Sequence, residues 1–161
     1  MLFRSALVEA YRGLEGAPPL VLVGRRLVEL PPTPGLVEVG PLPHALAIEA
    51  LRRAMIAVAP SLLPESFGIV ALEAAAAGKP AIVSDIGGLK DVVVDGETGY
   101  LAAPGDSGSL RRALRRLIED PALRERMGRA AIERAATFGP DAVVPRFEAA
   151  YELALARRRD R

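Results

Sequence analysis

Short apolar runs alternate with stretches of helical periodicity along the 161 residues of the chain. The apolar runs predict strands over 20–23, 36–39, 56–59, 81–83 and 100–101. Apolar residues at helical spacing predict helices over 2–14, 45–54, 67–77, 89–94, 107–119 and 141–157. Strands and helices that alternate at such short spacing are typical of βαβ units. The pattern predicts an α/β, Rossmann-like parallel sheet with helices on both faces, in a single domain over 1–161.

Polar and turn-forming residues refine the ends of these elements. Asp106 is expected to cap the helix over 107–119. Asp120 is expected to cap a further helix that has Pro121 at its first position. The run over 20–23 is typical of a buried parallel strand. Residues 25–35 are rich in Pro and Arg and predict a loop.

Composition excludes several kinds of site. The chain has no cysteine, which excludes disulfides and thiolate metal sites. Its single histidine, His44, argues against a histidine metal site or a catalytic triad, and a surface or capping role is favoured instead. A formal net charge of +1 provides no broad basic field, so nucleic acid is not expected as a partner.

The sequence gives weaker indications of the cellular compartment and of the kind of organism. No apolar run reaches the roughly 18 residues of a membrane span, and no secretory signal is evident, so a cytoplasmic location is expected. Asn and Gln are both absent. Loss of these heat-labile amides fits a thermophile, and a GC-rich genome produces the same bias.

The stretch over 60–78 carries the clearest chemical signal. A predicted strand ends before it, and a predicted helix begins at about Phe67, so a ligand is expected beyond the carboxyl end of that strand. The free N–H groups of Phe67, Gly68, Ile69 and Val70 would form an anion site suited to a phosphate. Gly68 would let the ligand approach the backbone closely.

Two carboxylates accompany this helix. Glu73 lies in a helix that is otherwise apolar on every face, and a buried carboxylate needs a partner such as the hydroxyls of a ribose. Glu65 precedes the helix and would accept hydrogen bonds from sugar hydroxyls in the same cleft. Simpler interpretations stay open: Glu65 favours a helix N-terminus electrostatically, and Glu73 is a structural carboxylate.

An ordered set of motifs surrounds these two residues. Seven residues separate Glu65 from Glu73, Phe-Gly-Ile follows the first, and Glu-Ala-x-Ala-x-Gly begins at the second. The sequences PAIVSDIGGL, VDGETGYL and PGD follow in order over 80–89, 94–101 and 104–106. Over about residues 40–155, the chain resembles the C-terminal, donor-binding domain of family-four retaining GT-B glycosyltransferases.

The resemblance implies transfer of a sugar from a nucleoside diphosphate with retained anomeric configuration. It assigns Glu65 to the transferred sugar as the catalytic position, Glu73 to the ribose, and the amides of 67–70 to the sugar and diphosphate. It places Gly87 and Gly88 beside the donor sugar, although they also read as a simple turn. Base contacts would come from near 40–43, mostly through the backbone. The resemblance implies no metal or other cofactor, because helix N-termini and basic side chains stabilise the leaving diphosphate.

The sequence also departs from this family. Relatives carry an Arg and a Lys on a first strand and loop that would precede residue 1, and Arg25 or Arg26 is a weak substitute. That strand lies centrally in the family's sheet, so a second chain, an unusual pairing or an artificial truncation is expected to account for the gap. The acceptor-binding domain of these relatives is not found in the chain either. The helix that relatives have between the second and third strands of the donor domain is here reduced to a Pro-rich loop.

These departures keep several functions open. The chain is expected to be half of an enzyme, which would need an acceptor-domain partner chain for catalysis. Alternatives are a non-catalytic nucleotide-sugar-binding or partner module, a subunit of a split enzyme, and another GT-B reaction such as sugar-nucleotide epimerisation. Four arginines at helical spacing are expected to form a solvated face, with peripheral contact to anionic lipid as the alternative; they are Arg111, Arg112, Arg115 and Arg116.

Overall fold

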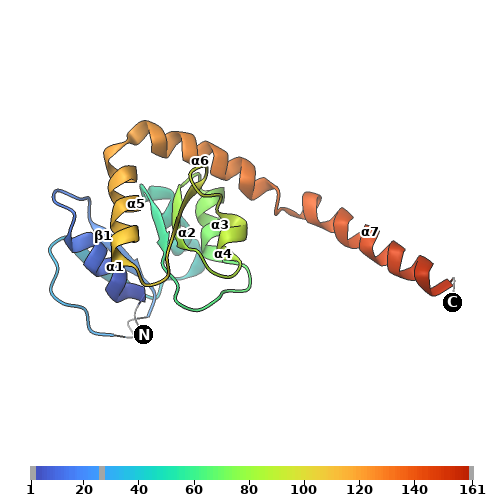
Figure 1. The fold of residues 1–161 in the computed structure, drawn as a ribbon, viewed down its shortest axis with the longest axis horizontal. Helices are drawn as coiled ribbons and strands as arrows, with labels where there is room; N and C mark the ends of the chain where they lie inside the picture. The colour runs from blue at the N-terminus through green and yellow to red at the C-terminus, as the bar shows by residue number, and fades with distance from the viewer. Residues whose placement is uncertain (1–2, 26–27, 160–161) are drawn as a thin grey trace.

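The computed structural model describes residues 3–25 and 28–159 as strands, helices and connecting loops (Figure 1). Its parallel strands are β1 (Leu20–Val23), β2 (Leu36–Gly40), β3 (Ala57–Ala59), β4 (Ala81–Ser84) and β5 (Gly99–Ala102). Its helices are α1 (Phe3–Arg12), α2 (His44–Arg53), α3 (Ile69–Ala76), α4 (Leu89–Val92), α5 (Ser107–Glu119), α6 (Pro121–Ala136) and α7 (Pro140–Arg159). The predicted α/β class is confirmed.

Helices cover both faces of the sheet formed by β3, β4 and β5. On one face, Ile82 of β4 packs in a core cluster with residues of α1 and α5, including Val8 and Leu110. On the other face, Val83 packs in a second cluster with residues of α3 and α4, including Ala74. Alternate residues of β4 therefore enter different cores, as expected of a strand buried on both sides.

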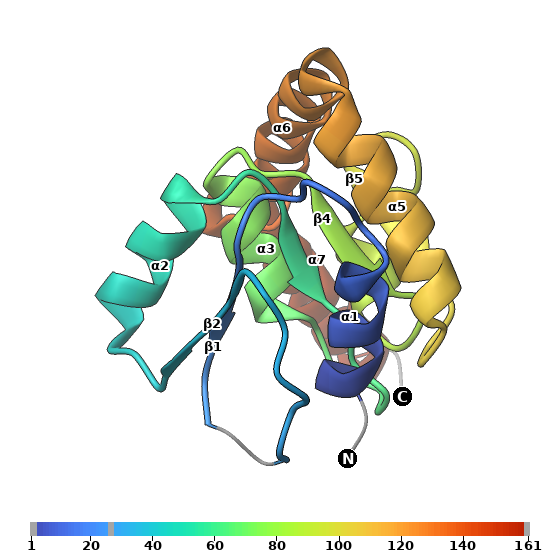
Figure 2. The same ribbon diagram turned by 90° about the vertical axis from the view of Figure 1, so that its left-hand side faces the viewer.

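The strands form two sheets, which differs from the single predicted sheet. β1 pairs only with β2, and β3, β4 and β5 pair in that order. Figure 2 shows β1 and β2 on one side of the molecule, and β4 and β5 on the other. Among the described residues, no unusual strand pairing closes the gap that the sequence led us to expect.

The strand β1 is less buried than its apolar sequence predicted. Leu22 lies in the core that α1 covers, but Val21 is 50% exposed and Val23 is 39% exposed. On β2, Val37 and Val39 are also exposed. The described part of 25–35 is loop, so it provides no helix to cover the outer face of this strand pair. The prediction of a fully buried strand is therefore wrong on one face.

Helix α3 begins at Ile69 and not at Phe67, because Gly68 adopts a left-handed conformation with φ of 84° immediately before it. A non-glycine residue rarely adopts this conformation. The helix is also not buried on every side. Ala71, Ala74 and Ala75 are buried, whereas Ile69 and Val70 are exposed in the first turn. The apolar composition of α3 therefore overstates its burial, since only one side packs on the sheet.

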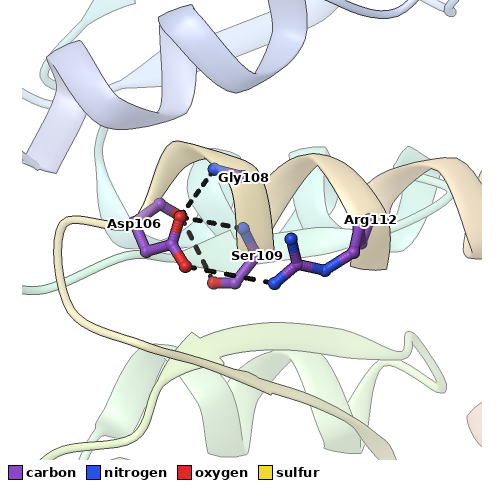
Figure 3. A network of polar contacts seen from close by, with 4 residues as sticks. All are labelled: Asp106, Gly108, Ser109 and Arg112. Atoms are coloured by element: carbon purple, nitrogen blue, oxygen red, sulfur yellow. Dashed lines mark hydrogen bonds and ion pairs between the residues drawn. The ribbon is translucent and has the colours of Figure 1, made fainter.

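Both predicted aspartate caps are present. Asp106 Oδ1 accepts hydrogen bonds from the N–H groups of Gly108 and Ser109 at the start of α5 (Figure 3). Asp120 Oδ1 accepts from the N–H of Leu123 at the start of α6. Each carboxylate satisfies amides that have no partner within their helix. The two aspartates therefore set where consecutive helices begin.

Replacing Asp106 with alanine is expected to destabilise the domain by about 1 kcal/mol, because the first amides of α5 lose their acceptor. Urea unfolding followed by circular dichroism measures the change. Asp91→Ala is the matched control, since Asp91 is exposed on α4 and its side chain makes no cap bond. Equal losses for the two variants would contradict the assignment of Asp106 as a cap.

The last helix, α7, extends away from the other elements (Figure 1). Its side chains Val144, Phe147, Tyr151 and Leu155 are exposed at helical spacing. Among the described residues, no helix combines the length and the apolar character that crossing a membrane requires.

Candidate functional site

Two loops meet beyond the carboxyl ends of β3 and β4. One follows β3 over 60–68, and the other follows β4 over 85–88. The N–H of Gly88 donates to the carbonyl oxygen of Glu65 at 2.8 Å, which joins the loops directly. Because β3 and β4 are adjacent parallel strands, their following loops lie at one edge of the sheet. The structure thus brings Glu65 and the Gly87–Gly88 turn together.

The two glycines of this turn allow the loops to approach closely. A Cβ on Gly88 would lie 2.6 Å from Phe67 Cα, and a Cβ on Gly87 would lie 2.5 Å from the Glu65 carbonyl oxygen. Gly87 also has a positive φ of 54°. Either side chain would therefore collide with backbone. The turn does more than reverse the chain, since it shapes the loop that carries Glu65.

The carboxylate of Glu65 is partly buried and held from within its own loop. The hydroxyl of Ser61 donates a hydrogen bond to Glu65 Oε1. This contact restrains the side chain before any ligand is present. Ser61 was not identified from the sequence, because a serine in a loop is too common to indicate a role.

The start of α3 presents free amides beside these loops. The N–H groups of Ala71 and Leu72 both donate to the carbonyl of Gly68, so they are the first amides that the helix satisfies. Those of Ile69 and Val70 come before them and have no acceptor in the turn. Both residues are exposed. Of the four amides predicted to form an anion site, those of Ile69 and Val70 thus have no acceptor in the first turn, and Phe67 and Gly68 lie in the turn before it.

Glu73 lies one turn into α3 and has a partner from a different element. Its Oε1 accepts a hydrogen bond from Nε2 of His44, the first residue of α2, at 2.7 Å. The Glu73 side chain is 23% exposed and that of His44 is 76% exposed. Glu73 is therefore only partly buried, and this hydrogen bond supplies one of the partners that its location requires.

His44 becomes a candidate site residue through its hydrogen bond to Glu73, and the sequence did not identify it as one. The expectation of a surface position is confirmed, but the capping role is not, because Pro43 occupies the N-cap of α2 and no side chain caps that helix. His44 and Glu73 are 29 residues apart, and no local pattern connects them. Only the position of His44 directly after the expected base-contact segment over 40–43 offered a signal.

The arginine-rich face of α5 has mainly intramolecular contacts. Arg111 donates to the carbonyls of Glu9 and Ala10 at the end of α1. Arg116 lies over the ring of Tyr100 at 5.4 Å from its centroid. Nη2 of Arg112 lies 4.0 Å from Oδ2 of Asp106, the residue that caps α5. These contacts favour a structural role for the face over contact with lipid.

Two further features define the surroundings of the site. A shallow cavity of about 370 Å³ lies at the amino ends of β1 and β2, where Tyr11, Arg12 and Gly35 contribute to its lining. It is thus at the edge of the fold opposite to the Glu65 loop and the start of α3. Within residues 3–25 and 28–159, no cluster of three or more His, Asp or Glu side chains is placed to hold a metal ion.

The chain is similar in sequence to one protein family and to several characterised proteins. The family model described as glycosyl transferases group 1 matches residues 38–134. Glycogen synthase of Mycobacterium tuberculosis is 49% identical over 96 residues, which are 60% of this chain and 23% of the relative. D-inositol 3-phosphate glycosyltransferase of Streptomyces avermitilis is 44% identical over 110 residues, 68% of this chain and 24% of the relative. The chain thus spans about a quarter of these relatives.

Solved structures share the arrangement of elements. Sucrose-phosphate synthase of Thermosynechococcus elongatus aligns with a TM-score of 0.81 at 29% identity, over 96% of this chain and 43% of that chain. The structure of Anabaena HepE in complex with UDP-glucose aligns with a TM-score of 0.77 at 22% identity, over 94% of this chain and 44% of that chain. At 22% identity, the similarity to HepE shows a shared fold and nothing more.

Proposed function

Because this chain belongs to the glycosyl transferases group 1 family and has the fold of a GT-B C-terminal domain, we propose that it binds a nucleoside-diphosphate sugar at the carboxyl ends of β3 and β4. The observation that carries the proposal is the contact between the Glu65 loop and the Gly87–Gly88 turn at the start of α3. Free amides and two carboxylates surround this contact.

Each group there matches one part of such a donor. The amides of Ile69 and Val70, at the positive end of α3, suit the diphosphate. Phe67 and Gly68 form the turn before these amides; Gly68 is buried, and a Cβ there would lie 2.7 Å from Leu89 Cδ2, so only glycine fits this turn. Glu73, one turn along, would accept hydrogen bonds from ribose hydroxyls.

The remaining groups suit the sugar. Ser61 restrains one oxygen of Glu65, so this carboxylate would accept from sugar hydroxyls with little loss of side-chain entropy. Gly87 and Gly88 line the same edge of the sheet. In the proposed reaction the bond between the anomeric carbon and the diphosphate oxygen breaks, the acceptor takes the sugar with retained configuration, and amides and cations stabilise the released diphosphate. No metal or other cofactor is part of this proposal.

A second candidate function is donor binding without transfer by this chain alone. It rests on the coverage of the relatives, since the chain aligns with 43% of the sucrose-phosphate synthase chain and 24% of the inositol phosphate glycosyltransferase. In this version the acceptor site lies on a further domain or partner chain. Transferase activity that returns only when an acceptor domain is added would favour it over a complete enzyme.

Removing the imidazole of His44 is expected to weaken donor binding by about threefold to tenfold, because Glu73 loses the hydrogen bond that orients its carboxylate. Isothermal titration calorimetry of His44→Ala measures the effect. His44→Gln is the control, since an amide N–H can replace the imidazole donor and should restore part of the affinity. Unchanged or tighter binding by His44→Ala would show that Glu73 acts without this partner.

Calorimetric titration of the unmodified chain with UDP-, GDP- and ADP-sugars tests the proposed function. UDP-glucose is the first ligand to use, since HepE was solved with it. Saturable binding of one of the three would support the donor site and identify the base. A folded chain that binds none of them would contradict the proposal.

A further inference from the structure

Two side chains at the end of α6 contact both halves of the candidate site from behind it. They are Arg134, in the last turn of α6, and Phe138, in the short turn over 137–139 that leads to α7. Both are partly buried. Helix α6 packs along α3 (Figure 1). Both residues lie beyond the motifs over 60–106, and the proposed function gives neither of them a role.

Phe138 contacts the turn that precedes α3. Its ring meets that of Phe67 edge to face, with 5.5 Å between the ring centroids and 79° between the ring planes. In this arrangement the positive edge of one aromatic ring faces the negative surface of the other. Phe67 is followed by the left-handed Gly68 and then by the free amides of Ile69 and Val70. The ring contact therefore holds the chain two residues before the first of these amides.

Arg134 holds the other half of the site through α4. Its Nη2 donates to the carbonyl oxygen of Asp91, and its Nε donates to that of Val92 at 3.4 Å. Carbonyl groups at the end of a helix have no partner within it, so a guanidinium can satisfy them. Helix α4 is only four residues long and begins directly after Gly88. Arg134 thereby fixes the far end of the helix that starts at the Gly87–Gly88 turn.

The contacts of Arg134 and Phe138 are joined to each other. The guanidinium carbon of Arg134 lies 4.9 Å from the centroid of the Phe138 ring, at the distance of a cation–π contact. Phe138 also packs against the buried cluster that contains Leu89, the first residue of α4. Leu89 lies against Gly68, since a Cβ on that glycine would be 2.7 Å from Leu89 Cδ2. One continuous set of contacts therefore runs from Phe67 through the end of α6 to α4.

The tip of the loop after β3 is exposed to solvent and depends on anchors to hold it. Leu63, Pro64, Ser66 and Phe67 are all exposed. Exposed loops shift at low cost in free energy unless side chains tie them to a rigid element. Binding groups have to stay within about 0.5 Å of the productive geometry to keep their effect. The contact between Phe67 and the end of α6 ties this loop to a helix of 16 residues.

We propose that Arg134 and Phe138 are positioning residues for donor binding. They hold the free amides of α3 and the Gly87–Gly88 turn at a fixed spacing, and they do so without touching the donor. This assignment rests on the proposed function, because the groups that they position are those assigned to the nucleoside-diphosphate sugar. Loss of either side chain releases the site while the buried cores of the domain stay intact.

Amide hydrogen exchange of the chain without ligand tests the positioning directly. NMR measures exchange in the unmodified chain and in Phe138→Ala. The reporters are the amide of Gly88, which bonds to the loop after β3, and those of Ala71 and Leu72, which bond to Gly68 in the first turn of α3. We expect these amides to exchange at least about tenfold faster in the variant, relative to the amide of Ile82 in the central strand.

Calorimetry measures the consequence for the donor that the unmodified chain binds. Phe138→Ala and Arg134→Met are each expected to weaken its binding by about tenfold, because the amides and the turn lose their common support. Methionine keeps the apolar length of Arg134 but cannot donate to the carbonyl groups of α4. Phe138→Tyr keeps the aromatic ring and should restore both the donor affinity and the slow exchange.

Leu123→Ala is the control for a general loss of stability. Leu123 is also on α6, but it is buried in the cluster that contains Ile82 and residues of α1 and α5. Its removal should lower the Tm and leave both the relative exchange and the donor affinity within about twofold. Equal effects of Leu123→Ala and Phe138→Ala on both measurements would overturn the proposal, and so would unchanged donor affinity in Phe138→Ala and Arg134→Met. An unmodified chain that binds no donor would instead overturn the proposed function, and the exchange rates would still show whether Phe138 holds the loops.

Discussion

Replacing Glu73 with alanine is expected to weaken binding of the nucleoside-diphosphate sugar by about 10–100-fold. A hydrogen bond to a charged group contributes about 1.5–3 kcal/mol, and a ribose presents two hydroxyls to the carboxylate. Glu73 is only 23% exposed and lies one turn from the free amides of Ile69 and Val70, so it can reach a ribose while they hold a diphosphate. Calorimetry with the preferred donor measures the loss.

The control for this variant is Glu49→Ala on α2. Glu49 is also a helix carboxylate with a side-chain partner, but it pairs with Arg53 at 2.8 Å on an exposed helix surface. Its removal changes the net charge by the same amount and should leave donor affinity within about twofold. Similar losses in the two variants would mean that charge alone matters and that Glu73 does not contact the ligand.

Replacing Gly88 with alanine is expected to abolish donor binding and to destabilise the fold by about 1–3 kcal/mol. The added Cβ would lie 2.6 Å from Phe67 Cα and 2.7 Å from the carbonyl oxygen of Ser66. Backbone cannot move aside as a flexible side chain does. The loop that carries Glu65 would have to shift, and a displacement of the binding groups by about 1 Å is enough to cost much of their effect.

Gly96→Ala separates this steric effect from the general cost of replacing a glycine. Gly96 has a φ of 76° and open space around its Cα, so alanine there strains the backbone without pressing on another loop. It should lower the Tm and leave donor affinity unchanged. Equal donor affinity in Gly88→Ala and Gly96→Ala would mean that donor binding does not need the contact between the loops after β3 and β4.

Features set by neighbouring residues could be predicted from the sequence. Asp106 and Asp120 precede helical stretches by one residue, so their caps depend on local spacing alone. The strands β3, β4 and β5 are short apolar runs bounded by turn residues, and all three were expected within a residue or two. The motif that contains Glu65 and Glu73 likewise drew attention to the loop after β3, which contacts the Gly87–Gly88 turn in the structure.

Features that depend on tertiary contacts could not be predicted. The pairing of His44 with Glu73 joins residues from two helices and is specified only when α2 packs on α3. The exposure of Val21 and Val37 depends on a covering helix that the described chain lacks, although their apolar run looks like a buried strand. The two-residue delay in the start of α3 depends on the left-handed conformation of Gly68.

The most direct test of the account is a map of where the donor binds. Backbone amide NMR spectra are recorded while UDP-glucose, or the donor that calorimetry selects, is titrated into the chain. We predict the largest shifts at Gly68, Ile69, Val70, Glu73 and Gly88, at the carboxyl ends of β3 and β4. Shifts centred on Tyr11 and Gly35, at the opposite edge of the fold, would contradict it.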